Sequence, residues 1–216
     1  MTPEQRKRIV LSQKDALRRN GYHPNALFWS NQAVQEIRFK NLAGIGIQRD
    51  DSLLDIGCGF GDFANYLLQN DLPVKYTGID ISGELIAEGK RQHHKLESFE
   101  LIEADIFDYN PADKSFDYVT LSGTLNRKFM GNQGAESARE YSLLLIKKMF
   151  DACKKGIAFN LLDARHEWTA NRWDLQSFHP DEILVEIKKL TDKFQLVDDY
   201  LENDFTFYAW RNDSCK

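Results

Sequence analysis

The feature that most constrains the fold is a short apolar stretch, residues 53–61, that three glycines at alternate positions interrupt. The apolar residues before the glycines are typical of a short buried strand, and those after them return at helical spacing. A strand, a glycine turn and a helix form the first crossover of a doubly wound α/β sheet. Glycine adopts positive φ angles, and a helix N-terminus offers free N–H groups. The sequence therefore predicts a ligand-binding turn at Gly57, Gly59 and Gly61.

Two classes of cofactor use such a turn, and the residues around it separate them. A dinucleotide fingerprint that begins with Gly57 and Gly59 needs a third glycine at the position where this chain has Asp62. Asp55, at the end of the strand, would repel a pyrophosphate but would attract an ammonium group, directly or through water. These acids disfavour a nicotinamide dehydrogenase and favour a cofactor with an α-amino group, a carboxylate and a sulfonium.

Two more acids follow predicted strands. Asp80 ends the second strand, where a carboxylate can bridge ribose hydroxyls, although an aspartate there can also cap the next helix. Asp105 follows the third strand and can accept a hydrogen bond from an adenine amino group, although it can also be a turn residue. Ile81 and Ile106 would then lie beside the adenine ring.

Four features in this order resemble the class I methyltransferases, which bind S-adenosylmethionine. Residues 55–61 resemble their motif I, and Asp80, Asp105 and the strand at residues 116–119 follow in the family's order. The resemblance covers about residues 50–162. It implies S-adenosylmethionine as cofactor and a seven-stranded, mostly parallel sheet of order 3-2-1-4-5-7-6 with strand 7 antiparallel. It implies no particular substrate.

The segment before the turn resembles a group of small bacterial-type methyltransferases. In these, a Trp-Ser…Gln-x-x-Arg-Phe helix precedes motif I, as Trp29-Ser30 and Gln35-x-x-Arg38-Phe39 do here. Arg38 lies on a predicted helix that ends just before the first strand, so it can pair with the cofactor's carboxylate, with Gln35 or Trp29 nearby. The alternative is an ordinary surface arginine.

A small polar loop, residues 122–126, follows the fourth predicted strand at the same sheet edge. Enzymes that methylate amino groups of DNA bases carry Asn/Asp/Ser-Pro-Pro-aromatic there, so its absence counts against that substrate class. Two residues of this loop complete the set predicted to bind the cofactor. The full set is Trp29, Gln35, Arg38, Asp55, Gly57, Cys58, Gly59, Asp62, Asp80, Ile81, Asp105, Ile106, Ser122 and Asn126.

The predicted substrate wall is an aromatic and polar insert, residues 163–179, after the fifth strand. Loops at the carboxyl ends of strands build the binding crevice of open α/β sheets. Alternatively, Trp168 and Trp173 only pack a lid. A sulfonium methyl group is already activated, so the protein mainly aligns a nucleophile for in-line displacement. A hydroxyl nucleophile would need a general base, for which His166, Asp163 and His179 are the candidates.

Composition narrows the possible partners. The net charge of −5 suggests no general affinity for nucleic acid. Residues 1–20 nevertheless carry six basic and two acidic side chains, which indicates either an RNA contact or a solvated helix face. The scattered cysteines, Cys58, Cys153 and Cys215, lack metal-ligand spacing. Because neither a signal peptide nor a membrane-length apolar run is visible, the sequence predicts a cytoplasmic protein without a membrane partner.

The sequence thus predicts a single α/β domain over residues 1–216, with a helical cover at 1–46 and the insert at 163–179. The leading function is methyl transfer from S-adenosylmethionine to a small-molecule acceptor. The alternatives are a methyltransferase that acts on RNA or protein, and a regulatory protein that binds S-adenosylmethionine without chemistry. Neither the acceptor nor the oligomeric state follows from the sequence.

Overall fold

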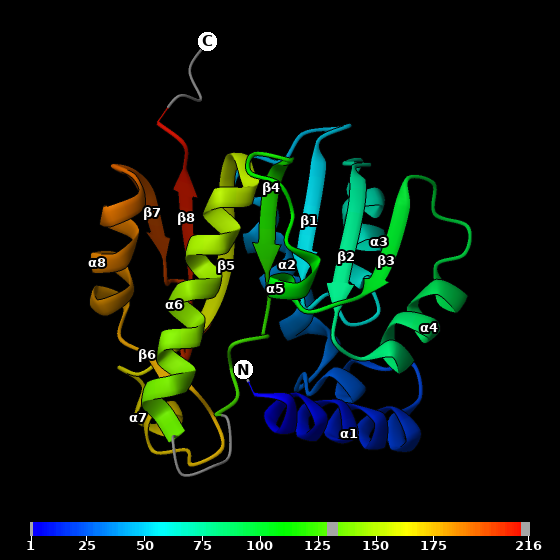
Figure 1. The fold of residues 1–216 in the computed structure, drawn as a ribbon, viewed down its shortest axis with the longest axis horizontal. Coiled ribbons are helices and arrows are strands. Elements are labelled where there is room, and N and C mark those ends of the chain that lie inside the picture. The colour runs from blue at the N-terminus through cyan, green and yellow to red at the C-terminus, as the bar shows by residue number, and fades with distance from the viewer. Residues whose placement is uncertain (1, 129–133, 213–216) are drawn as a thin grey trace. The chain divides into compact units, whose positions relative to one another are not determined.

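The computed structural model describes residues 2–128 and 134–212, in which helices and strands alternate along most of the chain (Figure 1). The chain divides into two compact units, residues 1–110 and 111–216. The single domain predicted over 1–216 stays a prediction.

The first unit carries a three-stranded parallel sheet of order β3-β2-β1. Asp55 of β1 pairs in register with Gly78 of β2, and Asp80 of β2 pairs with Glu103 of β3, so the carboxyl ends of the three strands share one edge. The elements of this unit are α1 (Pro3–Asn20), a 3-10 helix η1 (Pro24–Leu27), α2 (Gln32–Ala43), β1 (Ser52–Ile56), α3 (Asp62–Gln69), β2 (Lys75–Asp80), α4 (Gly83–Gln92), β3 (Phe99–Glu103) and α5 (Ile106–Tyr109).

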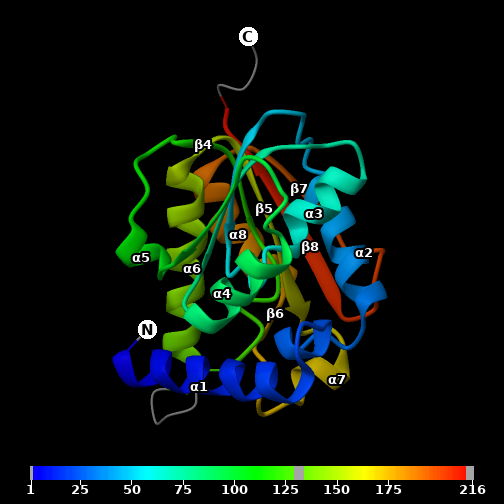
Figure 2. The same ribbon diagram turned by 90° about the vertical axis from the view of Figure 1, so that its right-hand side faces the viewer.

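The two N-terminal helices begin at polar caps. The Thr2 side chain accepts a hydrogen bond from the Gln5 backbone, and the Gln5 side chain bonds back to Thr2, which completes a capping box. Asn31 caps α2 by accepting from the Val34 N–H at 2.9 Å. α1 lies beside α4 in both ribbon views (Figures 1 and 2), and the Lys14–Glu84 ion pair joins these two helices.

The second unit has strand order β4-β5-β8-β7, with the short β6 paired to β5. β4 and β6 are parallel to β5, whereas β8 is antiparallel to both β5 and β7. Its elements are β4 (Phe116–Leu121), α6 (Gly134–Ala152), β5 (Cys153–Asp163), α7 (Glu167–Ala170), β6 (Ser177–Phe178), α8 (Pro180–Leu190), β7 (Lys193–Val197) and β8 (Asp204–Trp210).

These topologies confirm the predicted fold class, with one difference in detail. Both halves of the predicted order, 3-2-1 and 4-5-7-6, are present, and the last strand is antiparallel as predicted. The difference is the two-residue β6, which pairs with Leu162 and Asp163 inside the region predicted as an insert. The described residues therefore form eight strands rather than seven, and the predicted strands 6 and 7 are β7 and β8.

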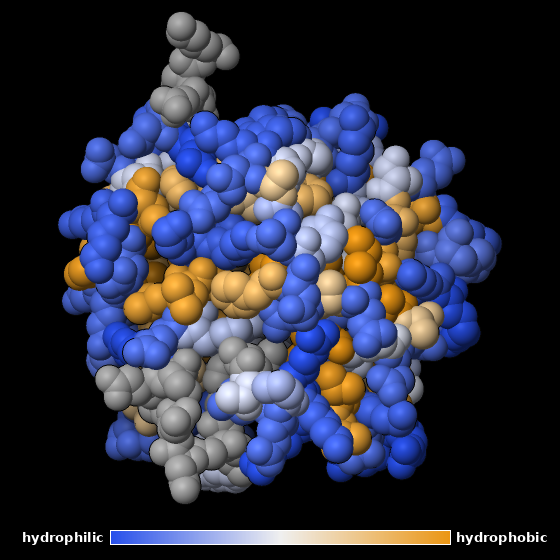
Figure 3. All heavy atoms as spheres, in the orientation of Figure 1, coloured by the Kyte–Doolittle hydropathy of each residue, from blue (hydrophilic) through white to orange (hydrophobic). Residues whose placement is uncertain are grey.

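Apolar side chains fill the interior of each unit, and the surface is mixed. In the second unit Phe159, Phe205 and Phe207 are fully buried, with ring centroids 5.8–6.1 Å apart between neighbours. The face seen in Figure 3 is mostly hydrophilic, with separate apolar patches. Trp168 and Trp173 of the insert are 52% and 71% exposed, which does not support their role in packing a lid. Within the described part of the chain, no helix has both the length and the apolar character needed to cross a membrane.

Candidate functional site

The glycine turn between β1 and α3 has the backbone conformation that its sequence predicts. Gly57, Gly59 and Gly61 all lie in the left-handed region, with φ of 69°, 57° and 79°. The N–H groups of Gly57 and Cys58 both donate to the Ile79 carbonyl, at 2.7 and 3.1 Å. The turn is therefore folded back onto the end of β2, beside Asp80.

Asp80 braces this turn directly. It is 5% exposed, one carboxylate oxygen accepts from the Gly59 N–H at 3.0 Å, and the other accepts from the Ser82 N–H at 2.9 Å. Burial raises the pKa of Asp80, against the opposing effect of these N–H groups. Ser82, and not Asp80, caps α4 by accepting from the Leu85 N–H. Because a carboxylate oxygen accepts more than one hydrogen bond, Asp80 retains capacity for two hydroxyl donors.

Asp55 has a partner that the sequence did not reveal. It is 4% exposed and accepts a 2.6 Å hydrogen bond from the hydroxyl of Tyr76, whose ring stacks on Phe99. Burial and the neighbouring Asp55 raise the pKa of Tyr76 well above its usual value, so Tyr76 remains a donor. The role of Asp55 toward an ammonium group stays a prediction.

Asp105 lies at the carboxyl edge of β3 but also caps a helix. It is 8% exposed, and one oxygen accepts from the Phe107 N–H at 3.0 Å at the start of α5. This geometry supports the turn role that the sequence left open, and the adenine contact stays a prediction. Ile106 is buried and Ile81 is half-buried.

The N-terminal segment brings Trp29, Gln35 and Arg38 together near the turn. The Arg38 guanidinium lies 4.7 Å from the centroid of the Trp29 ring, and the Gln35 amide donates to Asp62 at 3.4 Å. Arg38 is only 7% exposed, so the alternative of an ordinary surface arginine is wrong. Phe39, next to Arg38 on α2, packs against Trp29 and Phe63 and holds the helix beside α3.

Two residues at the turn were missed by sequence reasoning, Tyr22 and His93. Both contact the carboxylate of Asp62, the predicted cofactor ligand that opens α3. They lie 40 and 31 residues from Asp62 in the sequence, and no local pattern marks them. Their contacts arise only when α1 and α4 are packed around the turn.

In the second unit, the loop after β4 is paired with the insert. The Gln176 N–H donates to the Asn126 carbonyl at 3.0 Å, and the Lys128 N–H donates to the Asp174 carbonyl at 3.2 Å. The Gly123 N–H donates to Asn160 Oδ1 at 3.2 Å. The cofactor contacts predicted for Ser122 and Asn126 stay predictions.

The three candidates for a general base differ in their surroundings. Burial alone would raise the pKa of Asp163, but the Arg165 guanidinium at 2.6 Å holds that pKa below its usual range. Asp163 is therefore a poor base. The His179 backbone opens α8 and donates to Glu182. His166 Nδ1 is buried without a hydrogen-bond partner among the described residues, and its Nε2 lies 3.9 Å from Glu202.

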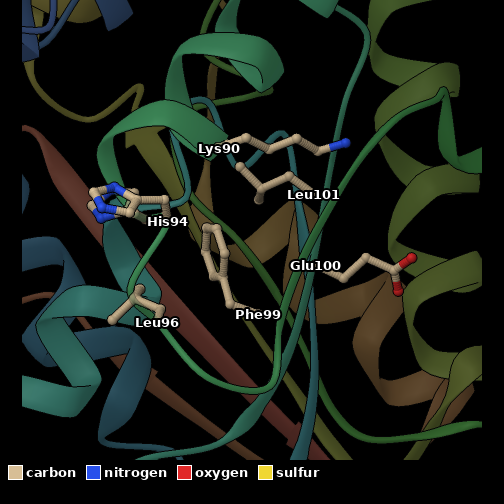
Figure 4. Close-up of a pocket in the computed structure, with 7 residues that line it drawn as sticks. Lys90, His94, Leu96, Phe99, Glu100 and Leu101 are labelled. Atoms are coloured by element: carbon tan, nitrogen blue, oxygen red, sulfur yellow. The ribbon is translucent and has the colours of Figure 1, made fainter.

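A hollow of about 260 Å³ lies against the outer strand of the first unit (Figure 4). None of the residues predicted to bind the cofactor lines this hollow. Two of its lining residues nevertheless touch the turn region, since the Phe99 ring lies next to Gly61 and His93 contacts Asp62. The lining residues are Lys90, His93, His94, Leu96, Phe99, Glu100 and Leu101.

Comparison with known proteins agrees with this geometry. Residues 53–143 match the model of a methyltransferase domain. Demethylmenaquinone methyltransferase of Staphylococcus aureus is 32% identical over 85 residues, which are 39% of this chain and 35% of that protein. The match thus spans about a third of the length of that relative.

Solved structures resemble the chain over more of its length. Magnesium protoporphyrin IX methyltransferase from Synechocystis PCC 6803, with bound S-adenosylhomocysteine, has a TM-score of 0.59 at 12% identity. The match covers 84% of this chain and 82% of that enzyme's chain. The [4+2]-cyclase SpnF has a TM-score of 0.59 at 18% identity, and the match covers 79% of this chain and 61% of the SpnF chain. The fold is that of the class I, Rossmann-like methyltransferases. Within that fold, residues 53–143 are similar to a methyltransferase domain.

Proposed function

We propose that the protein is an S-adenosylmethionine-dependent methyltransferase that acts on a small-molecule acceptor. The observation that carries the proposal is the glycine turn with three positive φ angles, braced by the buried carboxylate of Asp80. Bound S-adenosylmethionine would supply a methyl group that its sulfonium already activates. Asp80 fits the ribose hydroxyls, Asp105 the adenine amino group and Arg38 the carboxylate of such a cofactor.

The protein's share of the reaction is alignment of the acceptor and, for a hydroxyl acceptor, removal of its proton. Alignment in a near-attack geometry accounts for much of the barrier reduction in such transfers. An amine or thiolate acceptor needs no strong base. For a hydroxyl acceptor, His166 is the best of the three candidates, because its Nδ1 has no hydrogen-bond partner among the described residues whereas Arg165 occupies Asp163.

The basic first helix gives little support to an RNA acceptor. Arg6 pairs with Asp108 at 2.8 Å and Lys14 with Glu84 at 2.7 Å, so these charges join α1 to the rest of the first unit. Two of the positive charges that suggested a nucleic-acid contact are thus compensated by the unit's own acids. The demethylmenaquinone and protoporphyrin enzymes, both similar to this chain, act by their names on small molecules.

Uncharged polar groups in the second unit favour a neutral acceptor. Asn160 is fully buried, and because its Oδ1 accepts from the Gly123 N–H, its NH₂ group is the end that lacks a partner among the described residues. The Ser122 hydroxyl is likewise buried without a described partner. Two cations of the insert are occupied by acids of the insert itself, Arg172 by Asp174 and Arg165 by Asp163. This composition suits a hydroxyl or carbonyl better than a phosphate.

A transfer assay with methyl-labelled S-adenosylmethionine tests the acceptor class. The protein is incubated with cell extract, which is then separated into metabolites, RNA and protein. We expect protein-dependent label in the metabolite fraction. Label confined to RNA or protein would support the second function instead. No transfer, by a protein that binds S-adenosylhomocysteine in calorimetry, would favour a regulator or another chemistry on the same fold, as the similarity to a cyclase illustrates.

The contact of Arg38 with the cofactor carboxylate gives a sharper test of the site. A bidentate guanidinium–carboxylate pair cannot be reproduced by lysine. Arg38→Lys is therefore expected to weaken S-adenosylhomocysteine binding about tenfold or more while sparing methylthioadenosine, which lacks the carboxylate. Calorimetric titration of both ligands measures this. Equal losses for the two ligands, or none, would show that Arg38 does not contact the carboxylate.

A further inference from the structure

The carboxylate of Asp62 is the centre of a hydrogen-bond network around the glycine turn. The Tyr22 hydroxyl donates to Oδ1 at 2.6 Å, and His93 Nε2 lies 3.0 Å from the same oxygen. The Gln35 amide donates to Oδ2 at 3.4 Å. The three partners come from the loop after α1, from α2 and from the end of α4. One side chain therefore joins three segments to the turn.

Three of the four side chains of the network are shielded from water, whereas Tyr22 is 41% exposed. The side chains of His93 and Asp62 are 7% and 18% exposed, and Gln35 is 5% exposed. Because a carboxylate only accepts hydrogen bonds, His93 Nε2 must carry the proton that faces Asp62. Burial is the main cause that raises the pKa of Tyr22, and the charge of Asp62 is the second. Tyr22 therefore remains a donor at neutral pH. Both oxygens of Asp62 are thus already engaged by donors from the protein.

Tyr22 leads directly into η1, which lies on the glycine turn. Ala26 of η1 forms a buried cluster with Phe60 of the turn and Leu85 of α4. Leu27 contacts the middle glycine so closely that a Cβ at Gly59 would lie 2.8 Å from its Cδ2. The segment at residues 22–27 therefore covers part of the bare backbone that the glycines expose.

We infer that Asp62 is a positioning residue that, through Tyr22, holds residues 22–27 on the glycine turn and so sets the rate at which cofactor enters and leaves. The direct cofactor contact predicted for Asp62 from the sequence is the alternative to this role. It rests on the proposed binding of S-adenosylmethionine. Loosening the segment speeds exchange in both directions, because it lowers the barrier without removing a group that binds the cofactor.

Tyr22→Phe tests the inference, because it removes only the hydroxyl and keeps the ring that packs on Phe60 at 5.0 Å. Stopped-flow fluorescence would measure association and dissociation of S-adenosylhomocysteine. We expect both rates to rise about tenfold, the effect of losing one hydrogen bond to a charged group, with Kd changed less than about threefold. Amide hydrogen exchange at residues 24–27 should also become faster. Tyr66→Phe in α3, whose ring stacks on Phe63, is the matched control and should leave both rates unchanged.

Asp62→Asn is a second variant that keeps an oxygen for Tyr22 but removes the charge. Faster exchange at similar Kd supports the inference. A Kd raised tenfold or more through faster dissociation alone, with normal exchange in Tyr22→Phe, overturns it and makes Asp62 a cofactor ligand. If the wild-type protein binds S-adenosylhomocysteine but Tyr22→Phe exchanges it at the wild-type rate, only the positioning role fails. If the wild-type protein binds none, the proposed function fails as well.

Discussion

Replacing Gly89 with alanine is expected to lower the free energy of unfolding by about 2–3 kcal/mol, although alanine is the better helix former. Gly89 lies inside α4, which packs directly on the glycine turn. A Cβ there would lie 2.8 Å from the carbonyl carbon of Phe60 and 2.7 Å from the Leu101 side chain. Backbone cannot move aside as a flexible side chain can, so either the helix or the turn must shift. Urea denaturation of the variant and the wild type measures the difference.

Gly83→Ala in the same helix is the matched control for this substitution. The atoms nearest to its Cβ would be those of the carboxylate end of Glu103, a flexible side chain that can swing away. We expect its stability to stay within about 0.5 kcal/mol of the wild type or to rise slightly, from the gain in helix propensity. If Gly89→Ala proves as stable as Gly83→Ala, α4 does not pack on the backbone of the turn as closely as described.

The parts of the site that sequence predicted are those with a local cause. Alternating glycines at 57, 59 and 61 require an unusual backbone path whatever surrounds them, and their positive φ angles confirm it. The place of Asp80 at a strand end also follows from local pattern, because the end of the apolar run marks the edge of the sheet. The hydrogen bond that Asp80 accepts from the Gly59 N–H could not be predicted in this way, since that bond depends on how the turn folds back over β2.

The parts that sequence missed depend on packing between distant segments. Tyr22 and His93 reach Asp62 only when the N-terminal segment and α4 close around the turn. Helical periodicity placed Arg38 on a polar face, yet α2 buries it because the Trp29 ring covers its guanidinium. β6 escaped prediction because two residues are too short for an alternating pattern to appear. In each case the deciding contact is made by residues that are remote in sequence.

Asp80→Ala is expected to weaken S-adenosylhomocysteine binding by about 2–3 kcal/mol, which is roughly a thirtyfold or larger rise in Kd. The substitution removes the proposed bridge to the ribose hydroxyls and also the acceptor that holds the Gly59 N–H at 3.0 Å. Calorimetric titration measures the affinity. Glu103→Ala is the matched control, because Glu103 ends the adjacent strand in register with Asp80 but is exposed, so its removal should leave Kd unchanged.

Asp80→Ala should also change how the stability of the ligand-free protein depends on pH. Burial raises the pKa of Asp80 in the folded state above its unfolded value near 3.9, so folding takes up a proton between those two values. Its contribution to stability is fully present below the unfolded pKa and is lost as pH rises through the folded pKa. The wild type should therefore gain stability relative to Asp80→Ala as pH falls toward 4, as urea denaturation at several pH values would show. A stability difference between the two proteins that stays constant between pH 7 and pH 4 would contradict this expectation. In the calorimetric titration, an unchanged Kd for Asp80→Ala would show that Asp80 serves only to brace the turn.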